Sequence, residues 1–295
     1  MTNRISERLN ENSAVINDAL SKYLDWKNDN DKYPCLFDSL RHSTLNGGKR
    51  IRPYLTLEFN RLSGGNDESA IPYACAIEFA HTYSCVHDDL PCMDNDDLRR
   101  GIPTNHKVYG EATALLAGDA LLTHAFELIA DNKFTSDSNK LRTVKLLAQC
   151  AGIHGMIGGQ QLDLIGENTK YDFETLKYMQ YLKTGKLLIA ACVLGCYASG
   201  NDAYINAAVI YGEKIGLTFQ IIDDILDVTG DVETLGKNTG SDSGNDKTTF
   251  LSFMNVDEAY KYASELTDEA CDAIFGFAGS DILCDTAKYL LNRKK

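Results

Sequence analysis

Basic residues are scarce in this sequence, and their scarcity narrows the classes of protein to which it can belong. Lysine and arginine number 29 against 42 aspartates and glutamates, which gives a formal net charge of −13. That balance argues against a general surface for nucleic acid or for an anionic membrane. If the chain binds phosphate, the site must be a local basic patch.

Three further features are missing from the sequence. No C-x-x-C pair occurs among the nine cysteines, which favours reduced, buried thiols in a cytosolic chain. Residues 1–12 are polar and lack the apolar stretch of a signal peptide. No apolar run approaches the ~18 residues of a membrane span. We therefore expect a cytoplasmic protein without a membrane-spanning segment.

Alternating strand patterns, internal repeats and interdomain linkers are also absent, and apolar residues recur instead at helical spacing. We predict a single all-α domain over residues 1–295, a bundle of about ten or more helices. The polar stretch 230–246 is long enough to be a functional flap or a disordered loop. The expected helices cover residues 5–26, 36–45, 51–62, 71–90, 112–130, 141–165 (broken only by glycines), 173–198, 203–228, 258–272 and 282–291. Pro72 is expected in the first turn of the helix 71–90, and the residues from Asn255 to Glu258 resemble a capping box that opens the helix 258–272.

Five aspartates fall within ten residues at the end of one predicted helix, beginning with Asp88, Asp89 and Asp94. Pro91 should end that helix, so Asp94 would return to the site from a turn and not from the same helix face. Carboxylates this close repel one another, so a protein either leaves them in water or uses them to hold divalent cations. Oxygen ligands beside phosphate favour Mg²⁺. Arg99 and Arg100 follow at once and are suited to bidentate phosphate binding. Taken alone, such a run is also compatible with a solvated acidic loop.

A second acidic group lies inside the apolar predicted helix 203–228. At 3.6 residues per turn, Asp223 and Asp227 share one face, with Asp224 close beside it. Like charges on one stripe of a buried helix need a neutralising partner. Two acidic helix ends facing each other would form a multi-metal clamp for a diphosphate.

Candidate anion ligands follow Gly47 and Gly48, where Lys49, Arg50 and Arg52 surround a helix start. Glycines allow close approach to a ligand, and a helix start favours an anion. The alternative is a helix end followed by a solvated basic turn.

Four isolated residues have both a functional and a structural interpretation. His81 lies near two helical turns before Asp88 and shares its face, although a lone histidine at such a position is more often a core residue or a neighbour of the ligands. Lys183, before Thr184 and Gly185, is expected at a kink, or else as a lysine that extends from an apolar helix to water. Gln220 lies one turn before the second acidic group and either belongs to that site or satisfies a buried neighbour. Lys237 lies in the long loop and is either a ligand of the site or simply an exposed lysine.

Taken in order, these motifs resemble the trans-isoprenyl diphosphate synthase family, most closely its bacterial-type farnesyl diphosphate synthases. The resemblance implies a helical bundle around a central cavity and covers about residues 40–250. Asn95 and Phe250 depart from residues common in the family, and residues 256–295 match it only loosely. The matching segments are Gly47-Gly48-Lys49-Arg50-x-Arg52-Pro53, Asp88-Asp89-x-x-x-x-Asp94, Arg99-Arg100-Gly101, Gly159-Gln160-x-x-Asp163, Lys183-Thr184, Gln220-x-x-Asp223-Asp224-x-x-Asp227, Gly236-Lys237 and Asp246-Lys247-Thr248-Thr249.

The family resemblance implies a role for each motif. Magnesium, about three ions, would ionise an allylic diphosphate, and isopentenyl diphosphate would attack the resulting carbocation. Asp88, Asp89, Asp94, Asp223, Asp224 and Asp227 would hold the metal. Isopentenyl diphosphate would contact Lys49, Arg52, His81 and Arg100. The allylic diphosphate would contact Arg99, Lys183 and Lys237, while Thr184 and Gln220 would direct oxygen dipoles at the cation. Of these, Arg99, Lys183, Thr184 and Gln220 are the expected catalytic residues.

Product length is predicted from the residues just before the first acidic group. Tyr83 precedes Asp88 by five residues, about 7.5 Å along a helix at ~1.5 Å per residue. Its ring would act as a floor beneath the growing chain, next to Ser84. Together with the two extra residues inside the first acidic motif, Pro91 and its neighbour, this pattern resembles that of synthases with a C15 product, farnesyl diphosphate. Separately, the family resemblance implies a homodimeric assembly.

Three alternatives remain. A geranylgeranyl or other chain-length synthase would differ only in product. A non-catalytic partner subunit of a heteromeric synthase should have lost aspartates, and none is missing here. A class I terpene cyclase would not need Lys49, Arg52 and a second aspartate triplet.

Overall fold

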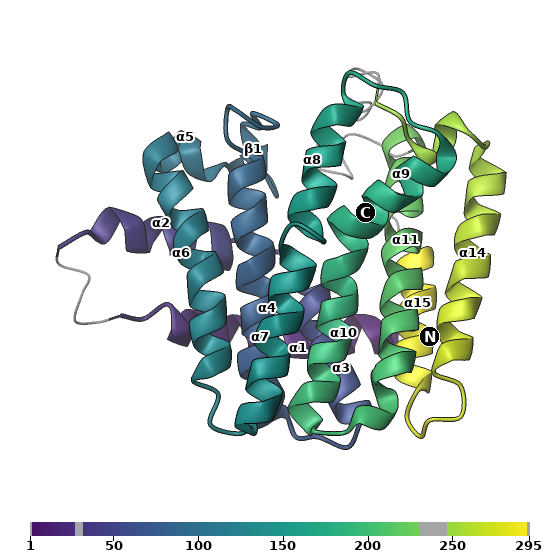
Figure 1. Cartoon of the computed structure of the whole chain (residues 1–295), viewed down its shortest axis with the longest axis horizontal. Coiled ribbons are helices and arrows are strands. Elements are labelled where there is room, and N and C mark those ends of the chain that lie inside the picture. The colour runs from purple at the N-terminus through teal and green to yellow at the C-terminus, as the bar shows by residue number, and fades with distance from the viewer. Residues whose placement is uncertain (1, 27–31, 230–246, 294–295) are drawn as a thin grey trace.

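The computed structural model describes residues 2–26, 32–229 and 247–293, and within these ranges the chain is a bundle of α-helices (Figure 1). The predicted all-α class is confirmed, whereas the single-domain boundary stays a prediction. The helices are α1 Thr2–Tyr23, α2 Pro34–Leu45, α3 Ile51–Leu62, α4 Asp67–Asp88, α5 Asn105–Tyr109, α6 Glu111–Ala130, α7 Asp137–Ala151, α8 Met156–Gly166, α9 Phe173–Gln180, α10 Lys186–Ser199, α11 Ile205–Thr229, α14 Val256–Ala273 and α15 Asp281–Leu291.

Several helix boundaries follow directly from capping side chains. Asn66 accepts a hydrogen bond from the Ser69 backbone N–H and so starts α4. Asn255 and Glu258 form a capping box at the start of α14, as the sequence predicted. Gly200, in the left-handed region, ends α10.

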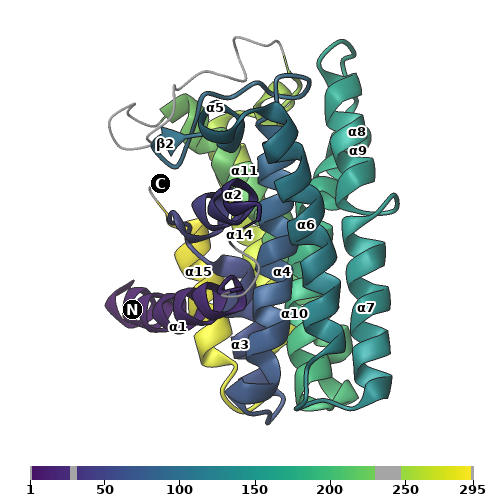
Figure 2. The ribbon, with the colours of Figure 1, turned by 90° about the vertical axis from the view of Figure 1, so that its left-hand side faces the viewer.

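The long helices run side by side, while α1 and α2 lie across them (Figure 2). Helix α10 packs against α3, α4 and α11. At the α3–α10 crossing the backbones are close, since a Cβ on Gly195 would lie 2.4 Å from the Thr56 carbonyl oxygen. The Thr56 hydroxyl also donates to the Ala191 carbonyl oxygen at 2.9 Å. Glycine at 195 therefore fixes the separation of these two helices.

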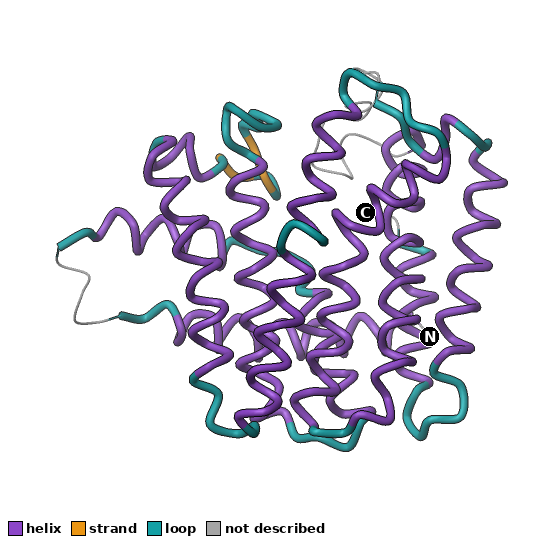
Figure 3. Tube along the Cα trace, viewed as in Figure 1, coloured by secondary structure: helices purple, strands orange, loops and turns teal. Residues whose placement is uncertain are grey.

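Local structure differs from the predicted helices in four places. The segment 141–165 is interrupted at Gly152–Gly155, so α7 and α8 are separate helices. A π-helical turn, Tyr181–Gly185, lies between α9 and α10, where the sequence predicted a kink. Pro72 lies inside α4, not in its first turn, because α4 starts at Asp67. Short elements were missed: a hairpin of β1 Leu98–Arg99 and β2 Ile102–Pro103, α5, and 3₁₀ turns at Asp202–Tyr204 and Phe250–Ser252 (Figure 3).

The hairpin pairs two residues of each strand in antiparallel register, Leu98 with Pro103 and Arg99 with Ile102. Its two central residues, Arg100 and Gly101, both have positive φ, of 56° and 79°. Positive φ at both positions is typical of tight hairpin turns. Strands this short show no alternating pattern, which is why the sequence did not reveal them.

Two continuous helical stretches of the described chain are long and apolar enough to cross a membrane by length and composition: Glu111–Ala130, which is α6, and Phe173–Ser199, which joins α9, the π turn and α10. Both stretches contain charged residues, so the search for uninterrupted apolar runs in the sequence did not find them. Of the most apolar 18-residue window in the second stretch, 78% is buried inside the bundle. Core helices pass the same test, so this is weak evidence for a span.

The cysteine prediction was wrong in part. Cys271 of α14 and Cys284 of α15 form a disulfide, with Cα atoms 5.0 Å apart. Cys35 and Cys92 are exposed free thiols, while Cys75, Cys150, Cys192 and Cys196 are buried, as expected. The thirteen-residue separation of the bonded pair matches no short motif, and it is the packing of α14 on α15 that brings the two sulfurs together.

Replacing Cys284 with serine should lower the free energy of unfolding by about 3 kcal/mol, because a cross-link over a short loop restricts the unfolded chain. Urea denaturation with and without a reductant would measure this loss. Reductant should destabilise the parent chain and leave Cys284→Ser unchanged. The control is Cys92→Ser, which removes an exposed free thiol. A parent chain that is indifferent to reductant would contradict the prediction.

Candidate active site

The two acidic groups lie at the same end of the bundle, because α4 and α11 both end there (Figure 1). Asp88 is the last residue of α4, and Asp89 is its C-cap. The Asp94 backbone N–H donates to the Asp88 carbonyl oxygen at 2.9 Å. The segment after Pro91 therefore folds back as a turn and returns Asp94 to Asp88, as predicted.

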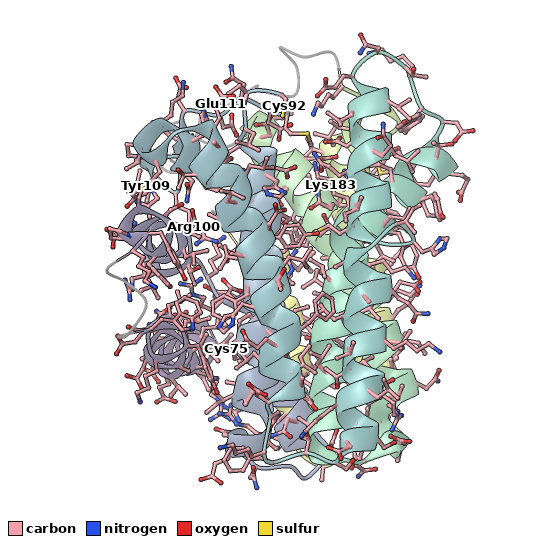
Figure 4. The ribbon with its side chains drawn as sticks, turned by 60° about the vertical axis from the view of Figure 1, so that its left-hand side comes forward. Cys75, Cys92, Arg100, Tyr109, Glu111 and Lys183 are labelled. Carbon is pink, nitrogen blue, oxygen red and sulfur yellow. A yellow bond between two sulfur atoms is a disulfide. The ribbon has the colours of Figure 1, made fainter. Side chains whose placement is uncertain are left out.

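The first acidic group is electrostatically strained. Burial, followed by the charges of Asp94 and Asp163, raises the pKa of Asp88 to about 6, although Lys183 and Arg99 oppose the increase. Burial also raises the pKa of Asp94, against Lys183 and Lys247. Lys183 and Cys92, which lies in the turn after α4, occupy the same end of the molecule (Figure 4). These carboxylates lack enough positive charge nearby, and a divalent cation would supply it.

Asp163 on α8 completes this cluster, and it was quoted in a motif but not predicted as a site residue. The Nζ atom of Lys183 donates to its carboxylate at 2.7 Å, and that of Lys247 at 3.5 Å. Burial alone would raise the pKa of Asp163, but the two lysines hold it below its ordinary value. A Cβ on Gly159 would lie 2.2 Å from the Lys183 backbone nitrogen, so glycine lets α8 approach the π turn. The spacing of Gly159 and Asp163, one helical turn, is the signal that could have found this residue.

The remaining predicted metal ligands have protein partners. Asp89 is bound by the Arg99 guanidinium, with Nη2 2.7 Å from Oδ1. Asp224 is buried and accepts a hydrogen bond from the Phe250 backbone N–H at 2.7 Å. Asp223 pairs with Arg293 at 2.7 Å.

Asp227 is half-buried on the same helix, α11. Across the described residues, no three His, Cys, Asp or Glu side chains are gathered closely enough to hold a metal ion. The assignment of the six aspartates to metal therefore stays a prediction.

The predicted isopentenyl site is a cationic cluster between α3, α4 and the hairpin. Arg100, held in the left-handed region, donates to the Gly47 carbonyl oxygen. A side chain on Gly48 would lie 2.7 Å from Arg100 Nη1, so this glycine makes room for the guanidinium. The Arg52 Nε is buried without a hydrogen-bond partner in the described structure. A buried donor without a partner suits an anion that completes the site.

His81 faces this cluster from α4. Burial, then the charges of Arg52 and Arg100, hold the pKa of His81 well below its ordinary value. The imidazole is therefore neutral at pH 7 and offers a hydrogen bond instead of a charge. The adjoining pocket is lined by residues including Asn46, Thr82, Cys85, Asp89, Arg99 and Arg100.

The basic residues after Gly48 divide into two groups. Lys49 is exposed and Arg52 half-buried, in positions compatible with ligand binding. Arg50 turns inward instead, forms a buried ion pair with Glu78 and donates to the Asn17 side chain. Arg50 is therefore a structural cation that anchors the start of α3.

Residues 34–273 match the family model for polyprenyl synthetases. The chain belongs to that family. The geranylgeranyl diphosphate synthase of Cyanophora paradoxa is 43% identical over 97% of this chain and 95% of its own length. The farnesyl diphosphate synthase of Micrococcus luteus is 43% identical over 88% of this chain and 90% of its own.

A crystal structure of the geranyltransferase from Helicobacter pylori, complexed with magnesium and isoprenyl diphosphate, superposes with a TM-score of 0.79 at 36% identity and covers 95% of this chain and 96% of its own. This polyprenyl synthetase is therefore a prenyltransferase of isoprenoid biosynthesis, as the sequence predicted. Identity to the farnesyl and the geranylgeranyl synthases is equal, so similarity alone does not distinguish the two products.

In this synthetase, the two residues that were predicted to direct oxygen dipoles at the cation are in contact with each other. The Thr184 hydroxyl, in the π turn, donates to the Gln220 side-chain oxygen at 3.0 Å. A Cβ on Gly216 would lie 2.8 Å from the Gly185 Cα, so glycine brings α11 against the π turn. Lys237, predicted to bind the allylic diphosphate, and the predicted flap 230–246 lie outside the described residues.

Tyr83 is buried on α4, and its hydroxyl has no hydrogen-bond partner within the described residues. Its ring stands edge-on to His87, with centroids 5.8 Å apart. Burial and then the nearby Asp88 charge raise the pKa of Tyr83 to about 12, so it stays neutral. Ser84 turns back to its own helix and donates to the His81 carbonyl oxygen at 2.8 Å. An aromatic side chain thus lies in the core on the helix that ends at Asp88.

Proposed function

We propose that this polyprenyl synthetase is a farnesyl diphosphate synthase, which condenses isopentenyl diphosphate head-to-tail with dimethylallyl and then geranyl diphosphate. The observation that carries the C15 product is Tyr83, a large buried ring five residues before the acidic end of α4. A ring there leaves little depth for a longer chain. Ser84, hydrogen-bonded within its helix, is the smaller contributor to this floor.

The acidic end of the bundle fits magnesium. Asp88 is half-buried beside the more exposed Asp94, the pKa of both carboxyls is raised although Lys183 lies near, and oxygen-only donors match a hard cation. These two residues, with Asp89, Asp223, Asp224 and Asp227, would hold about three ions. When bound, Mg²⁺ supplies charge that stabilises the departing pyrophosphate.

On the allylic side, Arg99 and Lys183 would hold the diphosphate. Both are already fixed by carboxylates, Arg99 by Asp89 and Lys183 by Asp163, so their side chains are pre-positioned. Lys237 is the third proposed contact. The Thr184–Gln220 pair directs oxygen dipoles at the positive carbon that forms when the C–O bond to pyrophosphate breaks.

The second substrate binds through a separate basic set. Lys49, Arg52 and Arg100 would hold the isopentenyl diphosphate group, and neutral His81 would add a hydrogen bond. The double bond then attacks the allylic carbon and forms the new C–C bond. A proton leaves the resulting cation to an oxygen of the released pyrophosphate, which restores a double bond.

The decisive experiment is incubation of the purified chain with isopentenyl and dimethylallyl diphosphates, with and without Mg²⁺, followed by product analysis. Farnesyl diphosphate formed only with metal supports the proposal. A C20 main product would favour the geranylgeranyl synthase, and no turnover with metal would favour a non-catalytic partner subunit.

We also propose a homodimer formed through the outer face of α6. Leu115 and Leu116 there are 48% and 56% exposed, and α6 is far less buried than the other long apolar stretch. Adjacent exposed apolar side chains on one helix indicate a surface that another chain covers.

Light scattering should give the mass of two chains, and Leu116→Glu should give one, because a charge buried in an apolar contact is unfavourable. The matched control is Phe275→Glu, a change at an 88% exposed side chain beyond α14 that should leave the dimer intact. A dimeric Leu116→Glu variant would place the interface elsewhere.

A further inference from the structure

Arg293 lies two residues after the end of α15 and is buried against α11. Its side chain is only 6% exposed. One nitrogen, Nη2, lies 2.7 Å from the Asp223 Oδ1 atom and donates to the Phe219 carbonyl oxygen at 2.8 Å. The guanidinium carbon stands 3.8 Å from the centre of the Phe219 ring. A residue from the end of the chain is thus held against the second acidic group.

This placement sets two cations in competition for one carboxylate. Asp223 is one of the aspartates that the proposed function assigns to Mg²⁺, and its Oδ1 is taken by the guanidinium. The Arg293 Nε is buried without a hydrogen-bond partner in the described structure. The arginine is therefore tightly packed but incompletely satisfied, so its position depends on the Asp223 charge and the Phe219 ring.

We propose that Arg293 is the counter-ion of Asp223 in the metal-free enzyme and that Mg²⁺ must compete with it to bind there. The inference rests on the proposed metal role of Asp223. The end of the chain would then set the metal concentration at which the second acidic group fills. Phe219 and Asp223 are one helical turn apart, so the ring and the carboxylate hold the same guanidinium from one face of α11.

The test is Mg²⁺ binding by the full-length chain without substrate, measured by calorimetry and by the shift of the melting temperature with Mg²⁺ concentration. Arg293→Gln should tighten Mg²⁺ binding by roughly five-fold, the scale of a partly exposed ion pair. Arg293→Lys keeps the charge and should stay near the parent value. Phe219→Leu, which removes the platform but leaves the carboxylate, should tighten binding by a smaller factor.

The matched control is Arg142→Gln. Arg142 also pairs with an aspartate, Asp202 at 2.9 Å, and stacks on an aromatic ring, Tyr197 at 4.2 Å, but on α7. Its loss should leave Mg²⁺ affinity unchanged.

Asp223→Asn separates this inference from the proposed function. If Asp223→Asn weakens Mg²⁺ binding while Arg293→Gln and Phe219→Leu leave it unchanged or weaker, the counter-ion role is wrong and the metal role stands. If Asp223→Asn changes nothing, the metal role itself fails. In the Asp223→Asn background, Arg293→Gln should have no further effect on Mg²⁺ affinity.

Discussion

Asp88→Asn is expected to lower kcat/KM by roughly 10³-fold or more, with Mg²⁺ saturating for the parent enzyme. Asp88 is the terminal residue of α4, adjoins Asp94 through the returning turn, and lies within the electrostatic reach of Lys183. Asparagine has the same shape but removes the charge that would hold metal against the leaving diphosphate. Steady-state kinetics with isopentenyl and dimethylallyl diphosphates would measure the loss.

The control for this substitution is Asp97→Asn, in the same loop. Asp97 is exposed and paired with Lys107 at 2.7 Å, away from the cluster. It should retain activity within a few-fold. Turnover near the parent level in Asp88→Asn would show that this carboxylate is not a metal ligand of the reaction.

Asp88→Asn should also stabilise the metal-free protein at neutral pH. The pKa of Asp88 is raised to about 6, so between its ordinary value and pH 6 the folded chain binds more protons than the unfolded chain. The free energy of unfolding therefore falls as pH rises through this window, and the loss is complete above it. Asp88→Asn removes that loss, so its melting temperature should exceed the parent value at pH 7 but not at pH 4. Scanning calorimetry without metal measures the difference.

Tyr83→Ala should lengthen the main product by at least one five-carbon unit. Removal of the ring opens space in the core on α4, directly below the acidic end. The alkyl chain grows into whatever depth is open, because burial of each methylene is favourable. Chromatography of the dephosphorylated products would show C20 or longer alcohols in place of C15.

Tyr83→Phe is the matched control for the floor. It keeps the ring and removes only a hydroxyl that has no partner in the described structure, so product and stability should both be preserved. If Tyr83→Ala still made only C15, the floor assignment would be wrong. A C20 product from the parent enzyme would show that the ring does not close the cavity.

The helical periodicity of the sequence predicted the long helices, because apolar spacing and capping residues are local signals. Asn255 and Glu258 predicted the start of α14 from four adjacent residues, and the structure confirms that box. The break between α7 and α8 was missed because glycine is tolerated inside helices as well as in turns. The hairpin at Arg100 was missed because strands of two residues have no period.

The candidate site, too, was predictable where the signal is local and unpredictable where it depends on distant segments of the chain. The turn that returns Asp94 to Asp88 followed from Pro91, a local signal. The Thr184–Gln220 hydrogen bond joins two segments that the family resemblance, not periodicity, had associated. Partners supplied by distant segments could not be predicted: Arg293 lies seventy residues after Asp223, and no pattern in the sequence links them.

Gly195 leaves α3 and α10 no freedom to separate. Because a Cβ at this position would lie 2.4 Å from the Thr56 carbonyl oxygen, any larger residue would force the two helices apart and unpack the core. Laboratory selection for other product lengths should therefore leave glycine at position 195, whatever it changes on the helix that carries Tyr83.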